Sequence, residues 1–287
     1  MTEGGNSDDK TPQPRRSWAD LGPRVASAGV LLPLTVVTLY VGGPLFALVI
    51  GAVFAGAYRE WDTMVTLKPL SSFGIFLMVA LFVAAALFPL WGAKATLAVA
   101  VVAAIAAAVR GGEGAFWRAG GVLYFGLVLM AILSTRNSPD SATGIWAGVF
   151  LGVVVWLTDT GAFFTGRQVG GEKLAPDISP AKTWSGALGG FVLGTLCGTI
   201  VWHFVTASPW WIGLLLAAAM SILGQVGDLA ESALKRRFRI KDSGDIIPGH
   251  GGLMDRLDSV TFGVIFLFTV GVLHGGAGAV APGFLNW

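Results

Sequence analysis

Nine long apolar runs constrain this chain more than any other feature of its sequence. They are continuously apolar rather than alternating, which favours transmembrane helices over the strands of a membrane barrel. Breaks such as Gly42-Gly43-Pro44 and Ser208-Pro209 separate them. An alternative reading joins the first two runs into one re-entrant hairpin. The approximate bounds of the runs are 25–41, 44–58, 71–89, 92–109, 119–134, 143–164, 185–206, 210–230 and 259–276.

Composition supports the same class. Of 287 residues, 54% are hydrophobic and only 13% are charged, which does not fit a soluble domain. We therefore expect an all-α, polytopic integral membrane protein with about nine transmembrane helices. Residues 1–22 are polar and rich in Pro and Gly, so they are expected to form a disordered cytoplasmic tail and not a signal peptide. Residues 23–142 would be N-terminal transmembrane helices, and 143–287 a catalytic transmembrane region.

The positions of Lys and Arg predict an orientation. If the N-terminus is cytoplasmic, all but Lys94 and Arg136 of the 19 basic residues fall in cytoplasmic segments. An error of one span would scramble this alternation. The pattern therefore predicts an outside or periplasmic C-terminus, and it places the loops 165–184 and 231–258 together on the cytoplasmic side.

Carboxylates recur at helical spacing on either side of the second loop. Asp228, Glu231 and Ser232 share one face of the eighth helix, and the segment 255–259 repeats the spacing with Asp255, Asp258 and Ser259 as the ninth helix begins. Two acidic helix ends facing each other would form an oxygen-rich site suited to Mg²⁺. The alternative is that Asp255 and Asp258 pair with Arg256 or with the nearby basic run.

That basic run, Lys235 to Arg239, has two readings. It is the ordinary positive-inside signal after a span, and it would also attract a polyphosphate. Gly251 and Gly252 allow close backbone approach to phosphate oxygens. His250, between glycines, suits a phosphate donor, a proton shuttle or a residue that stabilises the turn.

A second polar group follows the sixth run. Asp159 lies near its inner end. A carboxylate at the centre of a membrane helix costs about 2.5–3.5 kcal/mol on insertion scales, so such residues usually face a partner or a polar cavity. The loop after it carries Arg167 and Lys173. Lys182-Thr183, after Ser179-Pro180, reads either as a corner that grips phosphate or as the capped start of the seventh helix.

These motifs resemble the signature of the phosphatidate cytidylyltransferases, also called CDP-diacylglycerol synthases. The resemblance covers 156–262. One departure is Ser185, which stands where the family commonly has glutamate. The matching segments are Ser232-Ala-Leu-Lys-Arg, Lys241-Asp242-Ser-Gly, Ile247-Pro-Gly-His-Gly-Gly and Asp255-Arg-Leu-Asp258-Ser259, with an upstream block of Asp159-Thr-Gly-Ala-Phe-Phe, Gly166-Arg167, Lys173-Leu-Ala-Pro and Ser179-Pro-Ala-Lys182-Thr183.

The resemblance implies a Mg²⁺-dependent reaction of CTP with phosphatidate in the bilayer, in a homodimer of the inner membrane whose active site faces the cytoplasm. It implies no nucleic-acid partner. Asp228 and Asp255 would hold the metal, or a metal pair, with Asp258 and Asp159 as second choices. The implied catalytic residues are Asp228, Asp255, Lys182, Asp258, Arg256 and His250. The implied substrate-binding residues are Asp159, Arg167, Lys173, Ser179, Lys182, Thr183, Ser232, Lys235, Arg236, Lys241, Asp242, His250, Gly251 and Gly252.

Three other function classes compete. A transporter or channel for an anionic solute would explain Asp159, but the sequence has no visible inverted repeat and its polar residues crowd one side. A CTP-using lipid kinase is a closer rival, whereas the DGxxAR…GxxxDxxxD pattern of CDP-alcohol phosphotransferases is not found. A structural scaffold would leave the Gly-His-Gly-Gly turn unexplained.

Overall fold

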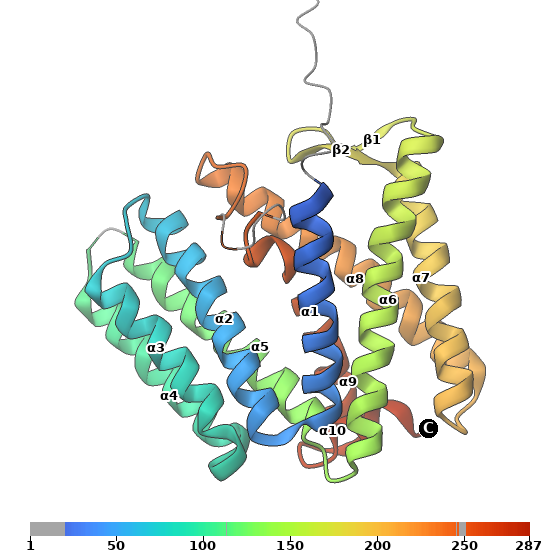
Figure 1. Cartoon of the computed structure of the whole chain (residues 1–287), viewed down its shortest axis with the longest axis horizontal. Coiled ribbons are helices and arrows are strands. Elements are labelled where there is room, and N and C mark those ends of the chain that lie inside the picture. Colours follow the sequence, from blue (N-terminus) through green and yellow to red (C-terminus); the bar gives the residue numbers. More distant parts are fainter. Residues whose placement is uncertain (1–20, 113, 245, 247–250) are drawn as a thin grey trace, which may run out of the picture.

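The computed structural model describes residues 21–112, 114–244, 246 and 251–287. The predicted tail therefore lies outside the described residues, apart from its last two positions. Each predicted apolar run falls on its own helix, although α2 and α8 continue eight and seven residues past the ends of their runs, and a short helix follows the last one (Figure 1). The helices are α1 Leu21–Val41, α2 Gly43–Thr66, α3 Ser72–Ala86, α4 Phe88–Arg110, α5 Ala115–Arg136, α6 Ser141–Gln168, α7 Trp184–Val205, α8 Trp210–Arg237, α9 Asp258–Gly275 and α10 Val280–Leu285.

Six helices of the described chain, α4 to α9, are long and apolar enough to cross a membrane. The helix α3 and the segment Leu32–Val41 of α1 are apolar but shorter. This composition is that of a multi-pass membrane protein. The prediction of about nine helices in these positions holds, whereas nine complete spans stay a prediction.

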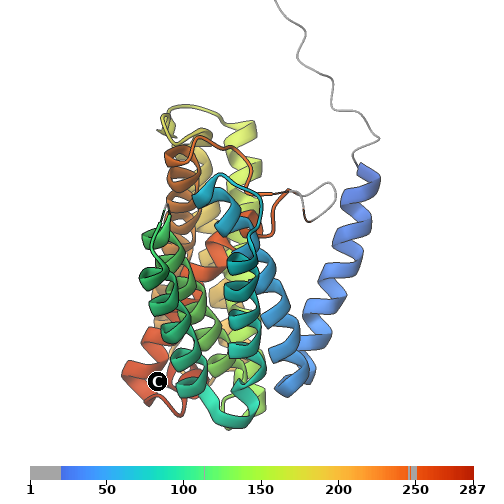
Figure 2. The same cartoon turned by 90° about the vertical axis from the view of Figure 1, so that its left-hand side faces the viewer.

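The helices form two groups that meet along α5 and α9. In Figure 1, α2 to α5 lie together on one side, and α6 and α7 lie on the other. Contacts of α9 with both α5 and α6 join the groups. Figure 2 shows that α1 leans away from the bundle toward its N-terminal end. The two halves of the chain therefore pack against each other in one helical bundle.

Small residues allow α6 and α7 to approach closely. Gly186, Gly190, Gly194 and Gly198 repeat every four residues along α7, so they form one stripe on the helix. A Cβ atom at Gly190 would lie well inside van der Waals contact with the carbonyl oxygen of Thr158 in α6. This backbone contact fixes the helix that carries Asp159 against the helix that begins at Thr183.

Gly190→Ala should therefore destabilise the protein by about 1–3 kcal/mol, because the added methyl meets backbone that cannot move aside. Gly120→Ala in α5 is the matched control, since a Cβ there meets nothing within 4 Å. That control should be neutral or gain up to about 1 kcal/mol from helix propensity. Thermal unfolding of the two variants in the same detergent measures the difference. Equal midpoints would contradict a tight α6–α7 contact.

The fold is all-helical as predicted, apart from one short two-stranded hairpin within the connection predicted at 165–184. The helix α6 continues to Gln168, and β1 (Lys173–Ala175) then pairs antiparallel with β2 (Ser179–Thr183). The Thr183 hydroxyl accepts a hydrogen bond from the N–H of Gly186 at 3.1 Å. Thr183 is thus the N-cap of α7, as the second of the two sequence readings proposed.

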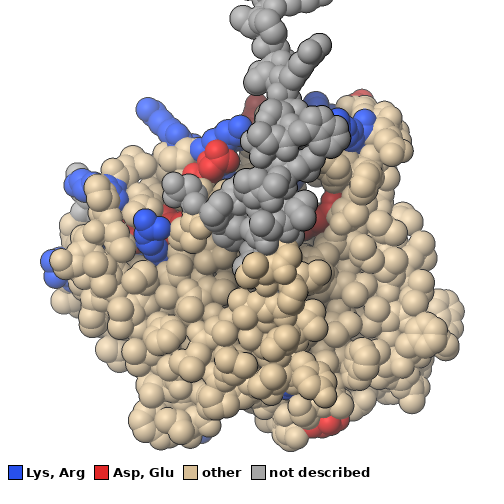
Figure 3. All heavy atoms as spheres, in the orientation of Figure 1, with Lys and Arg blue, Asp and Glu red and all other residues tan. Residues whose placement is uncertain are grey.

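Charged side chains gather at one end of the molecule. Figure 3 shows Lys, Arg, Asp and Glu concentrated near the end where the hairpin lies, above a broad band of uncharged atoms. At the other end, Arg136 is only 4% exposed and donates to the carbonyl oxygens of Leu39 and Tyr40. There its guanidinium closes the turn between α1 and α2.

Candidate active site

A cavity of about 680 Å³ opens at the charged end, between α6, the hairpin, α8 and the segment leading into α9. The two motif blocks, separated in sequence, supply its polar walls. The predicted site residues that line it are Asp159, Arg167, Lys182, Thr183, Asp228, Lys235, Asp242, Gly251, Asp255, Arg256 and Asp258.

Other predicted residues lie around the cavity and not in its wall. Ser232 donates from its hydroxyl to Asp228 at 3.5 Å. Arg236 donates to the carbonyl oxygens of Ile178 and Ile240, so it joins the end of α8 to the hairpin turn. The remaining members of this group are Lys173 and Ser179 in the hairpin, and Lys241 and Gly252 between α8 and α9. His250 lies outside the described residues.

An ion pair joins the two blocks. The Nζ atom of Lys182, from β2, lies 2.6 Å from Oδ2 of Asp228 in α8, and both side chains remain partly accessible from the cavity. The carboxylates of Asp159 and Asp258 are close enough to Asp228 to interact with it electrostatically. Carboxyl groups from three helices and a lysine from the hairpin thus converge on one volume, as the spacing of Asp228 and Asp258 predicted.

Asp255 has a different environment from the one predicted. It lies in a single 3₁₀ turn, Met254–Arg256, and α9 begins only at Asp258, so the two carboxylates do not share a helical face. Its Oδ1 accepts a hydrogen bond from Lys235 at 2.6 Å. Its Oδ2 accepts from the backbone N–H groups of Ser243 and Gly252. The segment bends to satisfy these donors, and Asp255 does pair with the basic run.

These contacts set the ionisation of Asp255. Partial burial favours the protonated form, but the hydrogen bonds and charge of Lys235 and the N–H of Ser243 outweigh burial and hold the pKa of Asp255 below its usual value. A carboxyl with a lowered folded-state pKa stabilises the fold fully above its unfolded-state pKa of about 4, and this stabilisation is lost as the pH falls through the folded-state pKa.

The stability difference between wild type and Asp255→Asn should therefore stay constant from neutral pH to about pH 5 and shrink below about pH 4. Thermal unfolding in detergent across this range measures it. Asp177→Asn, in the exposed hairpin turn, is a control whose difference from wild type should stay near zero throughout. A difference that disappears near neutral pH would contradict the lowered pKa.

The donor set fits a hard cation. Mg²⁺ binds through one or two carboxylates and completes its shell with water and substrate phosphates. Across the described ranges, no group of three or more His, Cys, Asp or Glu residues is arranged to hold a metal by itself. Both carboxylate oxygens of buried Glu231 lack a hydrogen-bond donor there, and its nearest cation is Lys235 at 3.5 Å. Glu231 lies beside Asp258 but outside the cavity wall, so the carboxylates that the described wall offers to a cation in the cavity are Asp159, Asp228, Asp242, Asp255 and Asp258.

Two observations were not predicted from the sequence. Glu60 of α2 hydrogen-bonds to the segment that carries Asp255, although the N-terminal helices were assigned no role. The available signal was a carboxylate at the inner end of an apolar run, the same signal that selected Asp159. Ser185 donates its hydroxyl to the carbonyl oxygen of Gly170, so this position fastens α7 to the end of α6 and carries no acid.

Comparisons with known proteins agree with this assignment of motifs. A model of the cytidylyltransferase family matches residues 23–274. A phosphatidate cytidylyltransferase of Brucella suis is 37% identical over 257 residues, which cover 89% of this chain and 94% of the relative. That of Bacillus subtilis is 42% identical over 147 residues, or 51% of this chain and 54% of the relative. The chain therefore belongs to the cytidylyltransferase family.

Proposed function

We propose that this membrane protein transfers CMP from CTP to phosphatidate, giving CDP-diacylglycerol and pyrophosphate. One observation carries the proposal: the two motif blocks meet in one polar cavity at the charged end of an apolar helical bundle. A water-soluble nucleotide can reach such a cavity from the aqueous side. Phe163 of α6 also lines it, which offers apolar surface toward the bilayer where phosphatidate resides.

The reaction joins two anions. A phosphate oxygen of phosphatidate attacks the α-phosphorus of CTP, a new P–O bond forms, and the bond to the β-phosphate oxygen breaks to release pyrophosphate. The attacking phosphate monoester is already ionised near neutral pH, so no strong base is needed. Positioning and charge neutralisation therefore supply most of the catalysis.

The cationic residues are proposed to bind phosphate. Lys182 is the first choice, because its ammonium already lies within the cavity beside a carboxylate that can orient it. Arg256 also lines the cavity and is exposed. Arg236 is a weaker choice than the sequence suggested, since two backbone carbonyls occupy its guanidinium.

Carboxylates are proposed to hold Mg²⁺, which when bound would neutralise phosphate charge. The sequence analysis named Asp228 and Asp255 for this role, with Asp258 and Asp159 as second choices. The contacts favour Asp228 with Asp258, because Asp255 already accepts three hydrogen bonds. Asp255 is then proposed to orient Lys235 and the adjoining turn.

The finer topology is part of the proposal. We propose nine spans with the N-terminus in the cytoplasm, the cavity facing the cytoplasm of a bacterial inner membrane, and assembly as a homodimer. The clustering of charge at the end that contains the cavity supports this orientation. Residues Lys94 and Arg136 lie in the segments that this topology places outside.

Purified protein incubated with radiolabelled CTP, phosphatidate and Mg²⁺ tests the proposal. The expected products are a labelled liponucleotide and pyrophosphate, and chelation of Mg²⁺ should abolish both. Diacylglycerol in place of phosphatidate should give no labelled lipid and no CDP. Release of CDP from that control would instead identify a CTP-using lipid kinase.

A further inference from the structure

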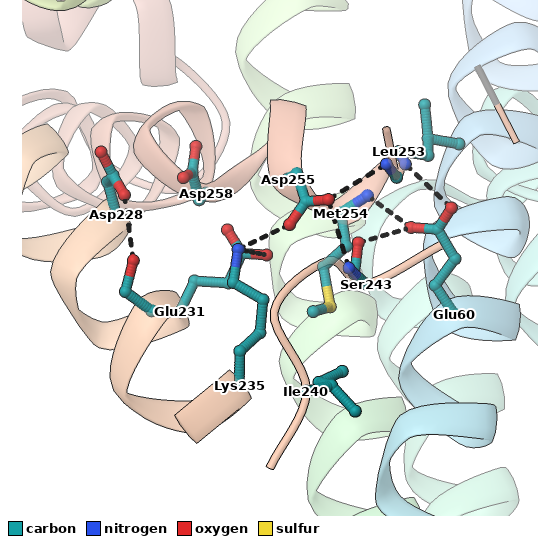
Figure 4. A network of polar contacts seen from close by, with 12 residues as sticks. Glu60, Asp228, Glu231, Lys235, Ile240, Ser243, Leu253, Met254, Asp255 and Asp258 are labelled. Atoms are coloured by element: carbon teal, nitrogen blue, oxygen red, sulfur yellow. Dashed lines mark hydrogen bonds and ion pairs between the residues drawn. The ribbon is translucent and has the colours of Figure 1, made fainter. Parts of the chain in front are cut away.

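Glu60 lies in α2, far in sequence from both motif blocks, and is only 2% exposed. Its Oε1 accepts a hydrogen bond from the N–H of Leu253 at 2.9 Å, and its Oε2 accepts one from the N–H of Met254 at 2.8 Å. The hydroxyl of Ser243 donates to the same Oε2 at 3.1 Å. One buried carboxylate of the N-terminal helices thus holds two separate points of the segment between α8 and α9 (Figure 4).

Asp255 holds the same segment from the opposite side. Figure 4 shows the carboxylates of Glu60 and Asp255 on either side of Ser243 and Leu253. Ser243 is shared, because its hydroxyl donates to Glu60 while its N–H donates to Asp255. The position of Asp255 in the cavity wall therefore depends on a turn that Glu60 fixes.

The fit around Glu60 is close. A Cβ atom at Gly244 would lie 2.6 Å from Oε1 of Glu60, and one at Gly252 would overlap the hydroxyl oxygen of Ser243 and lie 2.8 Å from Oε2 of Glu60. Any larger residue at either position would displace the carboxylate or the turn. Glu60, a residue outside the motif, thus leaves no room for a side chain at Gly244, and together with Ser243 it leaves none at Gly252.

The chemistry of the three donors requires a carboxylate. All are neutral N–H or O–H groups, and an ionised carboxylate accepts at both oxygens. A glutamine of the same shape would turn its NH₂ group toward at least one N–H of the turn, so a donor would face a donor. Hydrogen bonds to an ionised acceptor are also shorter and stronger than those to a neutral one.

We infer that Glu60 is a positioning residue of the active site, which places Asp255 and Arg256 in the cavity wall by fixing the turn 252–254. The inference rests on the proposed function for its effect on catalysis. It gives the N-terminal helices an indirect part in the reaction, although they contribute no residue to the cavity's polar wall in the described structure.

Glu60→Gln is the variant that tests the inference, with Glu172→Gln as a matched control on an exposed residue. We expect kcat for liponucleotide formation to fall about 10- to 100-fold in Glu60→Gln, as for other residues that orient a functional group, and to stay unchanged in the control. Hydrogen exchange of the amides at 252–254 should accelerate in Glu60→Gln, while exchange along α6 and α7 should not.

Ser243→Ala completes the experiment, because it removes a single donor and leaves Glu60 in place. It should lower kcat less than Glu60→Gln does. The fold-decrease in kcat of the double variant should be smaller than the product of the fold-decreases of the two single variants. If Glu60→Gln does not fold, Ser243→Ala alone tests the inference. Faster amide exchange at 252–254 together with a lowered kcat in that variant would support it.

Wild-type kcat and unchanged exchange at 252–254 in folded Glu60→Gln would overturn the inference, even if its melting temperature fell. Failure of the wild type to form any liponucleotide would instead reject the proposed function. The exchange measurement would then still report whether Glu60 fixes the turn.

Discussion

Asp228→Asn is expected to lower kcat by about 10²–10³-fold while the protein remains folded. The substitution keeps the shape of the side chain but removes the charge that pairs with Lys182 and, in the proposed function, helps to hold Mg²⁺. Such charge stabilisation is worth several kcal/mol, and each 1.36 kcal/mol changes a rate tenfold. Steady-state formation of the liponucleotide by the purified variant, at saturating CTP and Mg²⁺, measures the effect.

Asp177→Asn serves as its control, since it makes the same chemical change on the exposed hairpin turn, outside the cavity wall. That variant should turn over at the wild-type rate. Normal Mg²⁺-dependent turnover in folded Asp228→Asn would remove Asp228 from the catalytic machinery and leave its pairing with Lys182 as a structural contact.

Arg118→Met is expected to cost about 3–5 kcal/mol of stability, the largest effect we predict outside the active site. The Nε atom of Arg118 lies 2.7 Å from Oδ1 of Asp62, whose side chain is fully buried. Removing the guanidinium would leave Asp62 charged, buried and unpaired. The midpoint of thermal unfolding in detergent measures the loss.

Two comparisons make this prediction specific. Arg118 and Arg110 both lie over the ring of Phe73, but Arg110 is exposed, so Arg110→Met should cost no more than about 1 kcal/mol. Replacing both partners, as Asp62→Leu with Arg118→Met, should recover most of the lost stability, because no buried charge remains. A double variant as unstable as Arg118→Met alone would show that packing, not charge, is responsible.

The helices and the meeting of the two motif blocks were predictable from the sequence, because both follow from local patterns. Apolar runs mark helices directly, and the alternation of Lys and Arg placed 165–184 and 231–258 on one side. The β1–β2 hairpin was missed since its strands are short and lie among Gly and Pro residues. Asp255 does not share a helical face with Asp258, because α9 begins only at Asp258; its contact with Lys235 is the pairing with the basic run that the sequence analysis gave as the alternative.

Glu60 was missed for a different reason. Its hydrogen bonds span up to 194 positions, and no spacing rule relates residues so far apart. Only the folded chain brings α2 against the turn before α9. Long-range contacts of this kind are set by the packing of whole helices, which a single sequence does not specify.

The contact between Glu60 and the 252–254 turn also limits how such proteins can be recombined. A chimera that takes α1 to α5 from one relative and α6 to α10 from another would inherit every described residue of the cavity wall from a single parent. We expect full activity only if the parent of the first part supplies a carboxylate at position 60 and the parent of the second part has glycine at 244 and 252. Residue 60 from one parent must therefore be compatible with residues 244 and 252 from the other, although none of the described cavity-lining residues differs in origin.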